Sequence, residues 1–118
     1  TQYAGLAALL GSQAETAAML NAYQERRDVA VSMLNAIPGI TCLKPQGAFY
    51  AFPNIRSYGL SSSVMADLIL EKANVALLPG TAFGLCGEGY LRIVIANSLN
   101  NIQCALQRIA PVLMNLSA

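Results

Sequence analysis

The sequence predicts an α+β fold, in which helices pack on one face of a small, mostly antiparallel sheet of about three to four strands. Three observations lead to this prediction. Residues 2–36 are rich in helix-forming residues, residues 38–96 contain short apolar runs between glycines and prolines, and residues 99–113 carry apolar side chains three and four positions apart. The predicted order of elements is α-α-β-β-α-β-β-α, and it begins with a long helical arm.

The composition limits the size of the fold and the kinds of partner. The 118 residues are enough for one compact unit, and 55% of them are hydrophobic. Only 11% are charged, compared with about 25% in an ordinary soluble domain, so we expect part of the surface to contact protein. The net charge of +1 argues against nucleic acid as a partner. No apolar run reaches the roughly 18 residues of a membrane helix, and we expect a cytoplasmic protein with no membrane partner.

The absence of histidine excludes several kinds of site within these residues. The chain has no histidine and three cysteines, Cys42, Cys86 and Cys104. A zinc site of cysteine and histidine therefore cannot form, and neither can a nucleophile activated by histidine. An odd number of widely spaced cysteines is typical of reduced thiols in a cytosolic protein. We predict no metal site.

The first third of the chain predicts one short and one long helix. Gly11-Ser12 is the one break in a run of helix-forming residues from Gln2 to Ala36, and Pro38-Gly39 ends the second helix. We expect residues 1–37 to form a helical arm between domains and residues 38–118 to form the small α+β domain.

Four short segments after the arm predict strands. Their ranges are 40–43, 48–52, 75–78 and 90–95. A helix is expected between the second and third of them, capped by the serine cluster Ser61–Ser63 and ending near Ala73. The last helix is expected to begin at Asn97 or Ser98, and Pro111 is expected to kink or restart it.

The loop from Pro79 to Gly89 and the strand after it contain the main functional candidate. The loop has four glycines, a proline and no lysine or arginine, which favours a segment shaped by its backbone. The strand places one guanidinium, that of Arg92, among apolar residues. Two interpretations of Arg92 are open. In the first, it lies on a half-exposed face of the strand with Tyr90 and Val94, and its guanidinium is in water. In the second, its planar guanidinium binds a carboxylate or phosphate through two parallel hydrogen bonds.

Three segments, in order, resemble one protein family. They read PQGAFYAFPN from Pro45, NVALLPGTAFG from Asn74 and GEGYLRIVIANSLNNIQCALQRI from Gly87. Together they resemble the C-terminal small domain of the class I/II aminotransferases, which are fold-type I pyridoxal-phosphate enzymes, and especially the aspartate-aminotransferase-like branch. TQYAGLAALL and YQERRDVAVSMLNAIPGI look like the interdomain helical region of these enzymes, so the resemblance covers essentially the whole chain.

The resemblance implies a role for Arg92. At its position the family has the arginine that binds the α-carboxylate of the amino-acid substrate, which also orients the Cα–H bond for proton transfer. Phe49 and Phe83 fall in motifs near the mouth of the family's active site, but core packing explains them equally well. The glycines of these motifs are interpreted as turn positions rather than phosphate binders; they are Gly47, Gly80 and Gly84.

The resemblance also implies cofactor residues that this sequence does not contain. In the family, a lysine within a serine- and lysine-rich segment holds pyridoxal phosphate as a Schiff base, and other groups hold its ring and phosphate. All of them lie upstream of the region that resembles this chain. The only lysines here are Lys44 and Lys72. Neither lies in a sequence context like that of the cofactor lysine, and we expect both to be exposed. Arg92 is therefore the one predicted site residue, with no catalytic and no cofactor-binding residue in this chain.

Two functional hypotheses remain open from the sequence. In the first, the chain is a C-terminal fragment of an aminotransferase that transfers an amino group between an amino acid and a 2-oxo acid, since its first residues look like the middle of a helix. The parent enzyme would carry pyridoxal phosphate, include a large domain and form a homodimer, whereas the fragment alone would bind no cofactor and be inactive. In the second, the chain is a free-standing, non-catalytic module that binds a small anion or dimerises.

Overall fold

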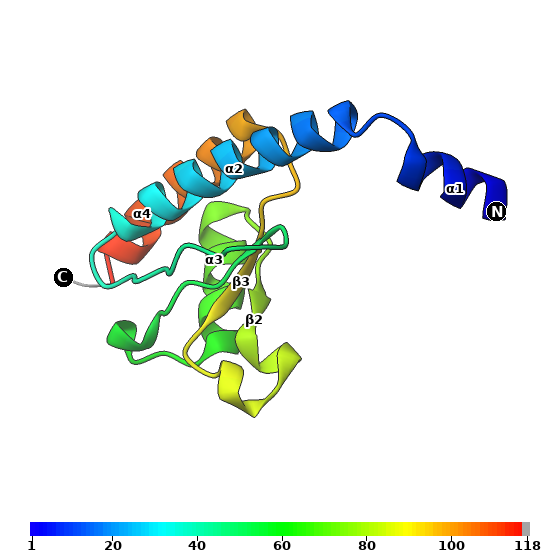
Figure 1. Ribbon diagram of the computed structural model, residues 1–118. Helices are drawn as coiled ribbons and strands as arrows, with labels where there is room; N and C mark the ends of the chain where they lie inside the picture. The colour runs from blue at the N-terminus through cyan, green and yellow to red at the C-terminus, as the bar shows by residue number, and fades with distance from the viewer. Residues whose placement is uncertain (117–118) are drawn as a thin grey trace.

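The computed structural model describes residues 1–116. Figure 1 shows two long helices, α2 and α4, side by side above a small sheet and α3, with α1 extending away from this body. The helices are α1 (Gln2–Leu10), α2 (Ala14–Asn35), α3 (Ser62–Ala73) and α4 (Leu99–Met114). The strands are β1 (Tyr50–Ala51), β2 (Leu78–Pro79) and β3 (Leu91–Val94), and three 3-10 turns are η1 (Arg56–Tyr58), η2 (Gly80–Phe83) and η3 (Leu85–Gly87).

The sheet is antiparallel, and its strand order β1-β3-β2 places β3 in the centre. Tyr50 of β1 pairs with Val94, and Leu78 of β2 pairs with Arg92. The predicted α+β class and the small antiparallel sheet are confirmed within the described residues.

The predicted strand at residues 40–43 is wrong. Thr41 forms only an isolated bridge to Asn54. The backbone of Cys42 is bound instead by a side chain, because its N–H donates to Asn35 Oδ1 at 2.8 Å and its carbonyl accepts from Asn35 Nδ2 at 3.0 Å. Backbone groups that are already paired with an amide have nothing left for a strand ladder. The element order is therefore α-α-β-α-β-β-α, apart from the 3-10 turns.

The other predicted strands are shorter or shifted. Strand β1 begins two residues later than predicted, since Ala48 takes a left-handed backbone with φ of 61° that ends the extended conformation. Strand β2 pairs at residues 78–79 rather than 75–78, and β3 at 91–94 rather than 90–95. The middle residues of each of these three predicted segments lie in or next to the observed strand. Differences of this size are usual for the predicted ends of an element.

The hydrophobic core lies between the sheet and the helices. Along β3, Leu91 and Ile93 are buried, whereas Arg92 is half-buried and Val94 is exposed. The predicted apolar stripe of α4 is confirmed, and its buried members are Ile102, Leu106, Ile109 and Leu113. Full burial of each such side chain contributes about 1.5–3 kcal/mol.

The helix ends follow the predicted capping serines. Ser61 accepts a hydrogen bond from the N–H of Val64, and Ser98 accepts one from the N–H of Asn101. Helix α4 does not restart at Pro111, and it continues to Met114. Because Pro111 lies in the last turn, its missing N–H removes only one bond near the helix end.

The N-terminal helices are much less packed than the rest. All residues of α1 are exposed, and Tyr3 and Leu9 keep 89% and 81% of their surface accessible. Figure 1 shows α1 projecting from the body. Helix α2 joins the core only through its second half, at Ala30 and Leu34. No helix within residues 1–116 is long and apolar enough to cross a membrane.

Candidate functional site

Arg92 lies in the central strand, on the face of the sheet opposite the core. The alternation along β3 puts its side chain on the same face as Val94, and the register adds Tyr50 and Leu78 from the two neighbouring strands. The predicted half-exposed face with Tyr90, Arg92 and Val94 is confirmed by the burial of these residues.

The guanidinium of Arg92 is covered by two aromatic rings. Its Cζ atom lies 3.7 Å from the centroid of the Phe83 ring and 4.4 Å from that of the Tyr50 ring. Tyr50 belongs to β1 and Phe83 follows β2, so the rings come from opposite sides of β3. A ring face attracts a cation within about 6 Å of its centroid, and the attraction grows when water is excluded.

The guanidinium nitrogen atoms of Arg92 have no hydrogen-bond partner in the part of the chain that the structure describes. Its Nε is the one buried side-chain polar atom in residues 1–116 without a hydrogen bond. None of the side-chain hydrogen bonds or ion pairs found there involves the Arg92 guanidinium. Nε is thus shielded from water, whereas the two terminal nitrogens are not among the buried atoms. A partly desolvated cation with free donors is costly alone and suited to receive an anion.

The sequence did not decide whether Phe49 and Phe83 belong to the site or to the core. The structure places them differently relative to Arg92. Phe83 contacts Arg92, whereas the Phe49 ring lies 4.6 Å from Tyr50 and 6.2 Å from Tyr23. Sequence reasoning missed Tyr50 as a neighbour of Arg92. The signal that could have found it is the alternation of β1, because pairing of Tyr50 with Val94 puts Tyr50 and Arg92 on one face.

The loop that carries Phe83 is shaped by a close crossing of two glycines. A Cβ atom on Gly80 would lie 2.1 Å from the carbonyl oxygen of Gly87, and one on Gly87 would lie 2.0 Å from that of Gly80. Gly84 has φ of 124°, a conformation that favours glycine. The backbone geometry therefore requires glycine at positions 80 and 84. Gly47 has no positive φ, and a Cβ atom added to it would have no neighbour within 4 Å.

The far end of the same loop is tied to the start of α3. The buried Ser62 hydroxyl accepts hydrogen bonds from the N–H of Gly89 at 2.9 Å and of Tyr90 at 3.2 Å. The Glu88 carboxylate accepts from the N–H of Ser62 at 2.8 Å, where the positive end of the helix dipole favours an anion. These bonds fix the loop at its end, next to β3.

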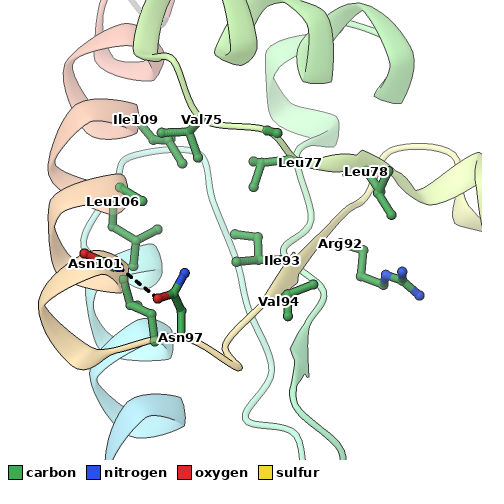
Figure 2. Close-up of a pocket in the computed structure, with 13 residues that line it drawn as sticks. Val75, Leu77, Leu78, Arg92, Ile93, Val94, Asn97, Asn101, Leu106 and Ile109 are labelled. Atoms are coloured by element: carbon green, nitrogen blue, oxygen red, sulfur yellow. Dashed lines mark hydrogen bonds between the residues drawn. The ribbon is translucent and has the colours of Figure 1, made fainter.

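A cleft of about 240 Å³ lies between α4 and the edge of the sheet. Figure 2 shows Val75, Leu77, Ile93 and Leu106 around it, with Asn97 and Asn101 at one end. Arg92 contributes to the wall, but its guanidinium points away from the cleft (Figure 2). The cleft is therefore mostly apolar, and the guanidinium of Arg92 lies outside it.

The two lysines lie at other places. Lys44 is exposed, and its Nζ lies 2.8 Å from Asp28 Oδ1, which also accepts from Arg27 Nε at 2.8 Å. The hydrogen bonds from Arg27 and then Lys44 lower the pKa of Asp28. Lys72 lies in the last turn of α3 and is exposed. The predicted exposure of both lysines is confirmed, and neither is placed beside Arg92.

The cysteines and acidic residues form no metal centre in residues 1–116, where no group of three or more possible ligands is placed to hold an ion. The three cysteines are free, and burial raises the pKa of the Cys42 thiol. Cys86 is exposed in the glycine loop.

Comparison with known proteins places this chain in a family. The family model of aminotransferase class I and II matches residues 1–109. The chain belongs to the class I and II aminotransferases. An aspartate aminotransferase of Pyrococcus horikoshii is 45% identical over 114 residues, which are 95% of this chain and 29% of that protein. The family membership and the resemblance to aspartate aminotransferases are thereby confirmed.

Solved aminotransferase structures have the same fold. An aromatic aminotransferase from Pyrococcus horikoshii superposes with a TM-score of 0.91 and 40% identity, over 98% of this chain and 31% of the other. A PLP-bound aminotransferase from Clostridium difficile superposes with a TM-score of 0.77 and 29% identity, over 81% of this chain and 25% of the other. The chain thus spans under a third of the length of these relatives.

Proposed function

We propose that the chain is the C-terminal small domain of a pyridoxal-phosphate-dependent aminotransferase, in which Arg92 binds the α-carboxylate of the substrate. Residues 1–37 form the arm between domains and residues 38–118 form the small domain. The whole enzyme moves an amino group from an amino acid to a 2-oxo acid. Family membership supports this reaction, because the relatives are aminotransferases.

The observation that carries the proposal is the unpartnered guanidinium of Arg92. An arginine on a strand normally reaches water or an acid, but Arg92 Nε is buried without a partner and no carboxylate of residues 1–116 pairs with it. Its two terminal nitrogens are likewise unpartnered and are not among the buried atoms. A substrate carboxylate can therefore bind end-on to them through two parallel hydrogen bonds.

The residues of this chain do not fit the cofactor. Pyridoxal phosphate, when bound to its enzyme, supplies an electron sink for the bonds at Cα. Lys44 is paired with Asp28, and Lys72 lies at the end of α3, so neither is arranged for covalent attachment beside Arg92. We infer that the large domain holds the cofactor and that this chain alone is inactive.

Within that enzyme, Arg92 contributes position rather than proton transfer. Two hydrogen bonds to a carboxylate fix both the distance and the orientation of the substrate. They set the direction of the Cα–H bond, on which the rate of proton abstraction depends.

The substrate's side chain is left open. One similar protein is named an aspartate aminotransferase and another an aromatic aminotransferase, although both match this chain at 40% identity or more. The carboxylate is common to all amino acids, so Arg92 fits every one of them. The proposal therefore names the reaction and the shared group of its substrates.

The substitution Arg92→Lys in the full-length protein tests the proposal. Lysine keeps the charge but cannot form the two parallel bonds, so we expect KM to rise about 10- to 100-fold with a smaller change in kcat. Steady-state kinetics with an amino acid and a 2-oxo acid measures both constants. Unchanged kinetics would show that the role is misassigned.

The exposed α1 favours a second role as an interaction module. Tyr3, Leu9 and Leu10 lie open on a helix with no buried residue, and such apolar surface usually meets protein. The partner is either the large domain or a second copy in a homodimer. Sedimentation of the 118-residue chain tests the second choice, and a monomer at high concentration would rule out dimerisation through α1 alone.

A further inference from the structure

We propose that Phe83 and Tyr50 are positioning residues for Arg92, which hold its guanidinium between two rings so that its terminal nitrogens stay free for an incoming carboxylate. This inference rests on the proposed role of Arg92. It adds two residues to the site, and it explains why no acid within residues 1–116 accompanies the cation.

The first step concerns how the charge is stabilised. A buried or partly buried guanidinium is usually paired with a carboxylate, which would occupy the donors and compete with a substrate carboxylate. At Arg92 the neighbours are ring faces at 3.7 Å and 4.4 Å from Cζ. A ring stabilises the cation through its electron-rich face and accepts no strong hydrogen bond. The charge is thus retained with its donors unused.

The second step concerns orientation. Phe83 and Tyr50 are carried on opposite sides of β3, so the guanidinium is flanked from both neighbouring strands. A free arginine side chain loses much rotamer entropy when it binds a ligand, and a stacked one has lost part of it already. The Nε atom is buried, whereas the two terminal nitrogens are not among the buried atoms.

The third step concerns how the rings are themselves held. The Tyr50 ring lies 4.6 Å from that of Phe49, which continues the aromatic contact to Tyr23 on α2. Phe83 ends η2, which begins at the tight crossing of Gly80 with Gly87. Each ring therefore also has contacts or backbone constraints that do not involve Arg92.

The chain offers a matched control on the same face. Phe52 is 38% exposed and Phe83 is 49% exposed, so their substitution by leucine removes similar rings from similar surroundings. The Phe52 ring stacks on Tyr90 at 5.5 Å, and it makes no ring contact with Arg92. A general effect of losing an aromatic side chain would appear in both variants.

The experiment measures binding of propionate to the full-length protein by ligand-detected NMR, with propionamide as the uncharged probe. Phe83→Leu and Tyr50→Leu are each expected to weaken propionate binding about tenfold, and to raise KM by a larger factor than they lower kcat. Phe83→Tyr, which keeps the ring, and Phe52→Leu should stay within about twofold of the original protein. Propionamide binding should be unaffected by all four substitutions.

The outcomes separate this inference from the proposed function. If Arg92→Lys leaves propionate binding unchanged, Arg92 is no carboxylate site and both ideas fail. If Arg92→Lys weakens binding but Phe83→Leu and Tyr50→Leu bind as tightly as Phe52→Leu, only the positioning role is overturned. Thermal melting of each variant identifies unfolding, and should one leucine variant unfold, the other ring supplies the same test from the opposite side of β3.

Discussion

Two arginines rest against aromatic rings near the same sheet, and their hydrogen bonds differ. Arg56 lies over Tyr90, with its Cζ 5.0 Å from the ring centroid, and its Nη2 donates to the carbonyl of Glu88 at 3.3 Å. The guanidinium of Arg92 lies closer to two rings and makes no hydrogen bond within residues 1–116. Arg56 is exposed, whereas Arg92 is half-buried with a buried Nε.

The difference teaches how to separate a structural cation from a binding one. Arg56 uses a donor to hold the backbone of the glycine loop, and its aliphatic stem fills the space beside Gly89, where a Cβ atom would lie 2.3 Å from Arg56 Cγ. The guanidinium N–H groups of Arg92 donate to no group within residues 1–116. Contact with a ring is common to both arginines, so the unused donors distinguish the proposed binding residue from the structural one.

Gly80→Ala should have the largest effect on this comparison, because it disturbs the loop that reaches both arginines. The added Cβ would lie 2.1 Å from the Gly87 carbonyl oxygen, so one backbone must move. We expect a loss of about 1–3 kcal/mol in the free energy of unfolding, together with weaker propionate binding as Phe83 shifts. Urea unfolding followed by circular dichroism measures the first effect.

Gly5→Ala is the control for that substitution. A Cβ on Gly5 meets nothing within 4 Å, and Gly5 lies inside α1. Alanine is the better helix former by about 1 kcal/mol, so Gly5→Ala should be neutral or slightly stabilising. Equal stability of the two variants would show that the Gly80–Gly87 crossing does not shape the loop.

Local patterns in the sequence predicted those features that local patterns determine. The stripe of α4 and the face of Arg92 follow from periods of 3.6 and 2 residues, which any buried helix or strand must keep. Ser61 and Ser98 were found as caps for the same reason, since a cap acts on N–H groups two or three residues away.

Features that depend on distant residues were missed. The strand at 40–43 is lost because Asn35, seven residues before Cys42, binds its backbone. The meeting of Tyr50 and Phe83 on Arg92 depends on the order β1-β3-β2, and no local pattern specifies which strands become neighbours. The role proposed for Arg92 came from the family resemblance, because a strand pattern by itself allows either a solvated or a ligand-binding arginine.

Arg56→Lys should have the smallest effect and gives the sharpest contrast with Arg92→Lys. Lysine keeps the charge but loses the planar contact with Tyr90 and the geometry of the bond to the Glu88 carbonyl. We expect a loss of less than about 1 kcal/mol in the free energy of unfolding, with propionate binding unchanged. If Arg56→Lys weakened propionate binding as much as Arg92→Lys, free donors would no longer distinguish the two arginines, and the carboxylate site would have to include both.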